Sequence, residues 1–497
     1  MINEKGEVQI GSTLLNWETY PAGGCYVRLF GEKYYRVSHV NQMPPFFMSV
    51  VSSSDHWLFI ASNGGLTAGR ANADSALFPY ETEDKITAHG EQTGSKTIIR
   101  VNRHEKTYLW EPFSERYAGV DNCERNLYKN IYGNKLIFEE INHDLQLTMR
   151  TAWSTGDGFG FIRSCWLLNN GNSECRIELL DGLQNLLPYG ADVALQNTFS
   201  NLLNAYKRNE LDAKTGVAIF ALSATLTDRA EPSESLKATV AWQVGLDSAG
   251  HLLCTDQLDA FRAGQPILPE RDVCGKAGAY FTNSTFELAP GQDRHWRIIA
   301  DVNQDSAKIV RLNRQLQHDQ DAILKALDED ITRGTAKLVH YVAAADGLQL
   351  TAQEMTTNHH FANVLFNVMR GGLFVSGYQI KRNDFLDFLE VRNRPLLTEY
   401  ASWLATLPDC FSIQELRDWA AETASPDLIR LCYEYLPLSF SRRHGDPSRP
   451  WNVFSINLKQ PDGSPKLDYQ GNWRDIFQNW EPLALSFPGF VEGMVAK

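Results

Sequence analysis

The sequence lacks several features that would assign it at once to a large class of proteins. No run of about 18 apolar residues occurs, so we expect no membrane-spanning helix. The first residues do not combine a basic segment with an apolar one, so no secretory signal is expected. P-loop, HExxH and GxSxG patterns are missing, which removes the usual signatures of nucleotide-binding enzymes, zinc proteases and serine hydrolases.

Basic residues are scarce relative to acidic ones. The 47 Lys and Arg against 60 Asp and Glu give a formal net charge of -13. A chain this acidic is a poor partner for a polyanion, so no binding to nucleic acid is expected. The eight cysteines are scattered and form no CxxC pair, which predicts reduced thiols, no metal site and a cytoplasmic protein.

What is present fits a large globular protein. The 497 residues predict about three domains at roughly 100–200 residues each. Hydrophobic residues make up 43% of the chain, enough for large cores, which excludes global disorder. Aromatic residues make up 11%, a share that suits β-domains and sugar-stacking sites equally well.

Residues 1–300 are rich in strand patterns. The stretches at 96–103 and 145–153 alternate apolar and polar residues, as half-buried strands do. Polar turn signals at 63–65 and 169–172 separate such stretches. Many strands with short turns predict a large antiparallel β-sandwich over residues 1–300.

The hydrophobic period changes to that of a helix near Asp305, which could cap its start. From there apolar residues recur at steps of three to four residues, or multiples of them, up to Ile331. We expect a linker over residues 301–335, either one long helix or a broken pair, ending near Gly334.

The rest of the chain, residues 336–497, has the pattern of helices joined by long loops. A helix is expected over 352–369, with the glycine pair at 371–372 as its stop. Two further helix starts carry cap signatures. These are a capping box at Ser412 and Glu415, and a cap followed by proline at Ser425 and Pro426. The predicted fold class is therefore a multidomain protein with an N-terminal β-sandwich, a linker helix and a helical C-terminal domain.

The segment 469–481 carries the densest chemistry. It holds two tryptophans, an arginine and two carboxylates: Trp473, Arg474, Asp475, Trp480 and Glu481. Aromatic faces stack on a pyranose ring, planar donors and acceptors contact its hydroxyls, and a carboxylic acid can protonate a glycosidic oxygen. The alternative is a loop whose tryptophans belong to the core and whose charges are solvated.

The stretch Gly471-Asn472-Trp473-Arg474-Asp475 resembles the Gly-Asp-Trp-Asn-Asp stretch of inverting glycoside phosphorylases of the cellobiose phosphorylase type. The resemblance implies that Asp475 is the general acid and that Trp473 lies beside the sugar being cleaved. Asn472 and Arg474 replace the family's Asp and Asn, at positions that concern contacts with the donor sugar.

The resemblance also concerns architecture. It implies a galactose mutarotase-like supersandwich, a helical linker and an (α/α)6 barrel of the six-hairpin glycosidase superfamily. Residues 377–387 are similar to a Gly-Phe-Arg-Asp-x-x-x-Asp segment that binds the glycosyl unit, which implies sugar contacts from Arg382, Asp384 and Asp387. A solvated helix face is the alternative. Residues 336–497 hold too few helices for six hairpins, so we expect a barrel that is only partly contained in this chain.

Two further groups are candidates for ligand contacts. In such enzymes a sandwich loop can border the active site, which makes Arg70 and Tyr80 candidates, with a plain turn as the alternative. Arg442, Arg443 and His444 form a basic cluster that could bind phosphate, with an exposed charge cluster as the alternative.

The expected activity is cleavage of a glycosidic bond of an oligosaccharide or glucan with inversion, by water or by phosphate. A hydrolase needs a second carboxylate as base, whereas a phosphorylase needs only the acid because phosphate is the nucleophile. Glu481, the nearest second carboxylate, would face elsewhere on a helix, which favours phosphorolysis with inorganic phosphate as co-substrate and no other cofactor. A homodimer is possible. The alternative is a non-catalytic carbohydrate-binding protein or an inactive fragment of such an enzyme.

Overall fold

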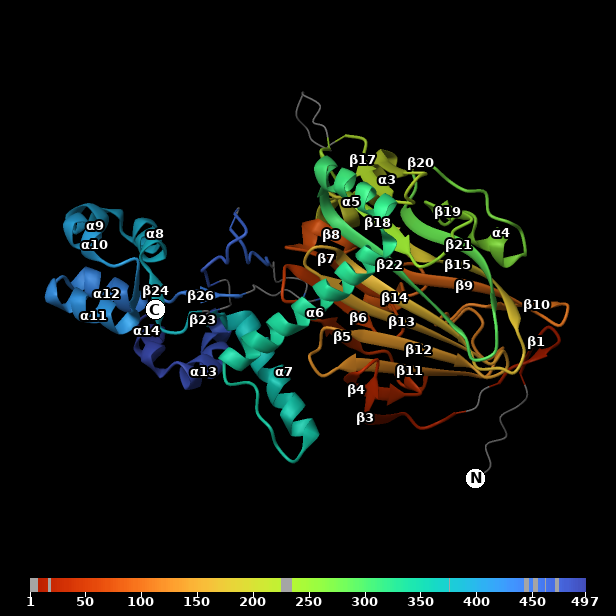
Figure 1. Ribbon diagram of the computed structural model, residues 1–497, viewed down its shortest axis with the longest axis horizontal. Helices are drawn as coiled ribbons and strands as arrows, with labels where there is room; N and C mark the ends of the chain where they lie inside the picture. The colour runs from red at the N-terminus through yellow and green to blue at the C-terminus, as the bar shows by residue number, and fades with distance from the viewer. Residues whose placement is uncertain are drawn as a thin grey trace. The chain divides into compact units, whose positions relative to one another are not determined.

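The computed structural model describes residues 8–16, 19–224, 235–374, 376–441, 447–449, 455–460, 462–469 and 473–497. The chain divides into two compact units. Met1–Thr335 with Asp446–Trp451 form a β-unit, and Ala336–Gly445 with Asn452–Lys497 form a helical unit. The predicted fold class, large antiparallel sheets followed by a helical region, is confirmed (Figure 1). No described helix is long and apolar enough to cross a bilayer.

The largest sheet of the β-unit has eleven strands, all antiparallel to their neighbours. It forms where the sequence alternates, because alternate residues point to opposite faces of a strand. In spatial order the strands are β20 (Asp272–Cys274), β16 (Lys207–Leu211), β17 (Ala218–Leu222), β18 (Lys237–Val244), β22 (Asp293–Asp305), β14 (Gly160–Asn169), β13 (Leu147–Gly156), β12 (Leu136–Asn142), β11 (Cys123–Asn130), β4 (Glu32–Ser38) and β3 (Gly23–Leu29).

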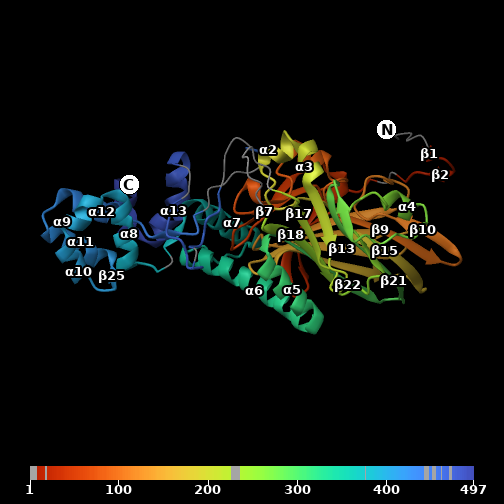
Figure 2. The ribbon, with the colours of Figure 1, turned by 90° about the horizontal axis from the view of Figure 1, so that it is seen from above.

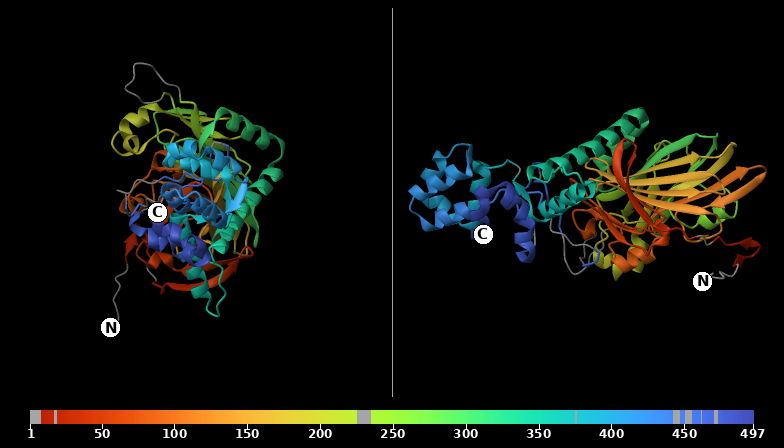
Figure 3. Two further views of the ribbon diagram at one scale, coloured as in Figure 1. Left: turned by 90° about the vertical axis from the view of Figure 1, so that its left-hand side faces the viewer. Right: turned by 90° about the horizontal axis from the view of Figure 1, so that it is seen from below.

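Two smaller antiparallel sheets complete the sandwich, as Figures 2 and 3 show from further sides. The five-stranded sheet runs β10 (Lys106–Trp110), β9 (Gly94–Arg103), β15 (Cys175–Leu186), β21 (Gly278–Leu288) and β19 (Gly250–Leu252). The four-stranded sheet runs β5 (Phe47–Val50), β6 (His56–Ala61), β7 (Leu66–Arg70) and β8 (Ala76–Phe78). The short elements are β1 (Gln9–Ile10), β2 (Thr13–Leu14), α1 (Glu83–Ala88), α2 (Val193–Asn197), α3 (Ser200–Tyr206) and α4 (Leu258–Arg262).

A buried polar cluster joins the two larger sheets within their apolar core. Asp181 of β15 accepts hydrogen bonds from Arg163 of β14 (2.8 and 2.9 Å), from Thr97 (2.6 Å) and from the Trp296 indole (2.6 Å). The Arg163 and Asp181 side chains have no solvent exposure. A buried charge is tolerated only when it is paired and hydrogen-bonded, so this cluster fixes how β14 and β15 face each other.

Two linker helices follow the last long strand, α5 (Ser306–His318) and α6 (Gln320–Ala344). Asp305 caps α5 as expected, accepting from the Lys308 backbone N–H at 2.9 Å. Their apolar stripe packs against strands β14, β17, β18 and β22 of the large sheet, with Leu327 fully buried. The expected end near Gly334 is wrong, because the helix continues to Ala344 with buried Leu338 and Val342 maintaining its apolar face.

The helical unit begins with the last turns of α6 and continues with α7 (Glu354–Gly371), which confirms the helix predicted over 352–369. Gly372 ends α7 with φ of 85°, a conformation that favours glycine. The capping box of Ser412 and Glu415 and the cap at Ser425 are both confirmed. The later helices are α8 (Arg382–Arg392), α9 (Arg394–Glu399), α10 (Ala401–Thr406), α11 (Ile413–Glu422), α12 (Pro426–Glu434), α13 (Ile476–Ser486) and α14 (Val491–Ala496). Two short ladders join β23 (Leu373–Phe374) to β26 (Leu438–Ser439), and β24 (Gln379–Lys381) to β25 (Cys410–Ser412).

Candidate functional site

Asp475 ends a short 3-10 turn, Trp473–Asp475, and stands at the N-cap position of α13. Its carboxylate accepts from Nε of the adjacent Arg474 at 3.2 Å. The Asp475 side chain is 35% exposed and that of Arg474 is 70% exposed. The carboxylate is therefore reachable by a ligand from solvent, and the hydrogen bond that it accepts comes from its neighbour in sequence.

Trp480 lies on the opposite, buried side of α13. Only 2% of the residue is exposed, its indole N–H donates to the Gly371 carbonyl at 2.8 Å, and its ring packs against Tyr469. These contacts join α13 to the end of α7 and leave no ring face of Trp480 open to a sugar. They support the alternative that this tryptophan is a core residue. Glu481 follows it on the exposed side of the helix.

Several predicted site residues cannot be placed. Arg442, Arg443 and His444 lie outside the described residues, as do Gly471 and Asn472. Only the backbone of Trp473 is described.

The three residues of α8 that were predicted to contact a sugar differ in their surroundings. Arg382 pairs with Asp409 at 2.8 Å and donates to the Leu407 carbonyl, so it fastens the start of the helix. Asp384 is half-buried and accepts a hydrogen bond from the Tyr435 hydroxyl, while Asp387 is exposed.

Asp384 has surroundings that an acid would need. Burial raises the pKa of Asp384, and the nearby Asp387 carboxylate adds to this rise, against the opposing hydrogen bond from Tyr435. An upward shift of the pKa is the direction that a proton donor needs, although the sequence indicated only sugar contacts for Asp384.

Arg70 and Tyr80 are held within the β-unit. The Arg70 guanidinium donates to Asp301 at 2.7 and 3.1 Å, to Asp55 at 3.2 Å and to the Asp157 carbonyl at 3.0 Å. Burial alone would lower the pKa of Arg70, but the carboxylates of Asp301 and Asp55 raise it above its ordinary value. Tyr80 is 8% exposed and meets Trp57 edge-on. These contacts favour a structural role for both residues.

The β-unit also contains a cavity of about 770 Å³, which the sequence did not indicate. We call it the sandwich cavity. Its described lining comes mainly from β10, β11 and the turns beside them. The residues are Val8, Asn16, Thr19, Tyr20, His39, Asn41, Gln42, Leu109, Trp110, Glu111, Ser114, Glu115, Tyr117, Ala118, Gly119, Val120, Asp121, Asn122, Cys123, Arg125 and Glu140.

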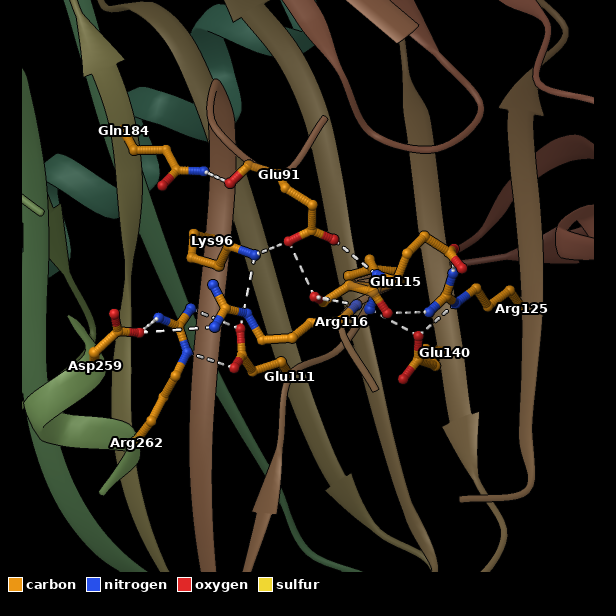
Figure 4. Close-up of polar contacts among 12 residues, drawn as sticks. Glu91, Lys96, Glu111, Glu115, Arg116, Arg125, Glu140, Gln184, Asp259 and Arg262 are labelled. Atoms are coloured by element: carbon orange, nitrogen blue, oxygen red, sulfur yellow. Dashed lines mark hydrogen bonds and ion pairs between the residues drawn. The ribbon is translucent and has the colours of Figure 1, made fainter. Parts of the chain in front are cut away.

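The floor of the sandwich cavity centres on Glu140 of β12. Its carboxylate accepts from the Trp110 indole (2.7 Å), the Phe113 backbone N–H (2.7 Å) and Nε of Arg125 (2.7 Å). Arg125 and Glu140 are direct partners across strands β11 and β12. The other Arg125 nitrogens donate to Glu115 and to the Ser114 carbonyl at 2.7 Å (Figure 4).

A second layer of ion pairs supports this floor. Glu111 has a fully buried side chain and accepts from Arg262 at 2.6 and 2.9 Å. The Lys96 ammonium pairs with both Glu111 and Glu91, as the dashed lines in Figure 4 show. Burial would raise the pKa of Glu91, but the Lys96 ammonium outweighs this and lowers it. The charges beneath the cavity therefore compensate one another.

The rim of the sandwich cavity is aromatic and amidic. Tyr20 is 45% exposed and stacks on His39 with ring centroids 5.0 Å apart, and Tyr117 is 40% exposed. Burial raises the pKa of Asp121, and its neighbours Asp144 and Glu140 add to this against the hydrogen bond from Asn142. Trp110, Glu111 and Glu115 lie close together in the sequence, but their spacing alone does not indicate a cavity.

Among the residues that the structure describes, no group of three His, Cys, Asp or Glu side chains is arranged to hold a metal ion.

Residues 374–437 match the model of glycoside hydrolase family 149 insertion domain 1, which relates the chain to carbohydrate-active enzymes through this segment. Arg382, Asp384 and Asp387 fall inside it. No curated protein sequence matches the chain.

Solved structures show distant likenesses. A bacterial glucoamylase complexed with acarbose is 10% identical, with 79% of this chain and 57% of that chain covered and a TM-score of 0.33. A protein described as a kojibiose phosphorylase from the human microbiome is 9% identical, with 71% and 40% covered and a TM-score of 0.30. An aldose epimerase homologue from C. elegans is 9% identical, with 53% and 100% covered and a TM-score of 0.28. The chain spans less than two thirds of the first two proteins, and likenesses at these scores support no inference about activity.

Proposed function

We propose that this chain is all or part of a carbohydrate-active enzyme that cleaves a glycosidic bond of an oligosaccharide or glucan with inversion. The observation that carries the proposal is the match of residues 374–437 to a glycoside hydrolase insertion domain. The Trp473-Arg474-Asp475 stretch, which resembles the acid-bearing stretch of inverting glycoside phosphorylases, supports it from the sequence.

In this proposal Asp475 is the general acid. Its proton goes to the glycosidic oxygen, the bond from the anomeric carbon to that oxygen breaks, and the leaving sugar departs as an alcohol. A phosphate oxygen attacks the anomeric carbon from the opposite face, which gives a sugar 1-phosphate of inverted configuration. With water as the nucleophile the product is the free sugar, and a carboxylate must then accept the proton of the water.

The exposure of Asp475 supports access to a substrate, and its position at the start of α13 fixes its backbone. Trp473 and Arg474 are proposed to contact the sugar beside it. Arg442, Arg443 and His444 are proposed to contact phosphate, since a basic cluster binds its oxygens by charge and hydrogen bonds.

The test is product analysis with glucose-based disaccharides and trisaccharides, with and without inorganic phosphate. Phosphate-dependent release of a sugar 1-phosphate identifies a phosphorylase, and free sugar without phosphate identifies a hydrolase. Asp475→Asn is expected to abolish either reaction, while Glu422→Gln, at an exposed carboxylate on α11, leaves the rate within about twofold. Equal rates in Asp475→Asn and the unchanged protein would refute the role of Asp475.

A second candidate is a carbohydrate-binding protein without catalysis. The sandwich cavity favours it, because its described lining belongs entirely to the β-unit and includes none of the residues proposed for catalysis. Saturable glycan binding without turnover, in the presence and absence of phosphate, would select this function over the enzyme.

A further inference from the structure

We propose that the sandwich cavity is a binding site for a neutral oligosaccharide, held by the β-unit without any part in bond cleavage. The proposal stands on the cavity's own residues. It does not depend on Asp475 or on the enzymatic function proposed above.

The size of the cavity suits a small polar ligand. Its volume of about 770 Å³ falls within the roughly 300–1,000 Å³ of typical ligand sites. Its floor is fixed before any ligand binds, because Glu140 accepts three hydrogen bonds and Arg125 donates to three groups. A fixed floor lowers the entropy that binding must overcome.

The charges of the lining argue against an anionic ligand. Glu111, Glu115 and Glu140 are all engaged by Arg262, Lys96 or Arg125. Asp121 accepts from Asn142 at 2.7 Å. Among the described lining residues, the single arginine is Arg125, whose three side-chain nitrogens donate to Glu140, Glu115 and the Ser114 carbonyl, so it is not open to a phosphate. Four carboxylates beside one guanidinium also repel an anion.

The rim provides what a sugar needs. Tyr20 and Tyr117 present partly exposed rings, which can cover the apolar face of a pyranose. The amides of Asn41, Gln42 and Asn122 line the same cavity and can donate to and accept from hydroxyl groups. Aromatic faces together with neutral amides point to a carbohydrate rather than to an anionic metabolite.

The experiment is isothermal titration calorimetry of the full chain with maltotriose and with cellotriose. We expect saturable binding of at least one trisaccharide. Tyr117→Ala should weaken the Kd about tenfold or more through loss of ring stacking. The matched control is Tyr108→Ala, because Tyr108 is 41% exposed, close to the 40% of Tyr117, and lies on β10 outside the cavity lining. This control should keep its Kd within about twofold.

The outcomes separate binding at the cavity from the proposed reaction. No saturable binding of either trisaccharide, or equal Kd values in Tyr117→Ala and Tyr108→Ala, would overturn the cavity proposal. Equal urea midpoints for both variants show that any loss of binding is not unfolding. Turnover by Asp475→Asn is measured separately, so a failure of the reaction leaves the binding result intact.

Discussion

The two units of the chain organise their charges differently. In the β-unit, Arg163 and Asp181 are fully buried and pair between two sheets. In the helical unit, Arg474 and Asp475 are adjacent in sequence, with side chains that are 70% and 35% exposed. A sheet brings residues that are distant in sequence together and can therefore form a polar cavity. A local motif can be recognised in the sequence, but its contacts are with its sequence neighbours. The β-unit therefore holds its polar groups by contacts between strands, whereas the proposed acid lies at an accessible helix start.

The largest expected effect tests the buried side of this comparison. Asp181→Ala would leave the Arg163 guanidinium buried without its carboxylate and remove the acceptor of Thr97 and Trp296. We expect the free energy of unfolding of the β-unit to fall by about 4–5 kcal/mol, measured by urea denaturation. Asp272→Ala, which breaks the exposed pair with Arg208, is the control and should change little. Similar effects in the two variants would contradict the account of the cluster.

The next effect concerns a residue that the sequence suggested for sugar stacking. Trp480→Ala should lower the free energy of unfolding of the helical unit by about 3–4 kcal/mol, because it removes a buried indole and its bond to Gly371. Phe477→Ala on the same helix, where the side chain is 77% exposed, should cost less than about 0.5 kcal/mol. Equal urea midpoints in the two variants would show that Trp480 is not a core residue.

A third effect is the acid sensitivity of the β-unit. Burial lowers the pKa of His251 from its ordinary 6.5 to about 4, and its Nε2 is buried with no hydrogen-bond partner among the described residues. The unfolded chain binds this proton below pH 6.5 and the folded chain only near pH 4, so stability falls as pH falls through this window. The loss from His251 is at most about 3 kcal/mol. Unfolding measured between pH 7 and 4 should be flatter for His251→Phe, and an unchanged slope would contradict this.

The smallest effect tests the helical unit at a local motif. Ser412→Ala removes the side chain that accepts from the Glu415 backbone N–H at the start of α11. We expect a loss of about 1 kcal/mol in the free energy of unfolding, by urea denaturation. Ser412→Thr keeps the hydroxyl and should recover most of it, while equal losses in both variants would argue against the cap.

The sequence predicted the features that local periodicity and caps specify. The order of sandwich, linker and helices, the cap at Asp305 and the capping box at Ser412 are examples. The end of the helix was misjudged because Gly334 suggested a stop, although the apolar positions continue at Leu338 and Val342.

The sandwich cavity could not be predicted, because only strand register places its groups together. Arg125 and Glu140 are 15 residues apart and become partners through the pairing of β11 with β12. Trp480 could have been recognised as core, since Ile476, Trp480 and Leu483 follow helical spacing and all three are buried.

The central claim is that the sandwich cavity binds glycan independently of the bond cleavage proposed at Asp475. The most direct test is the Kd of cellotriose, measured by calorimetry, in Tyr117→Ala and Asp475→Asn of the full chain. The account predicts a Kd about tenfold weaker in Tyr117→Ala and unchanged in Asp475→Asn. A Kd that weakens in Asp475→Asn and stays unchanged in Tyr117→Ala would contradict it.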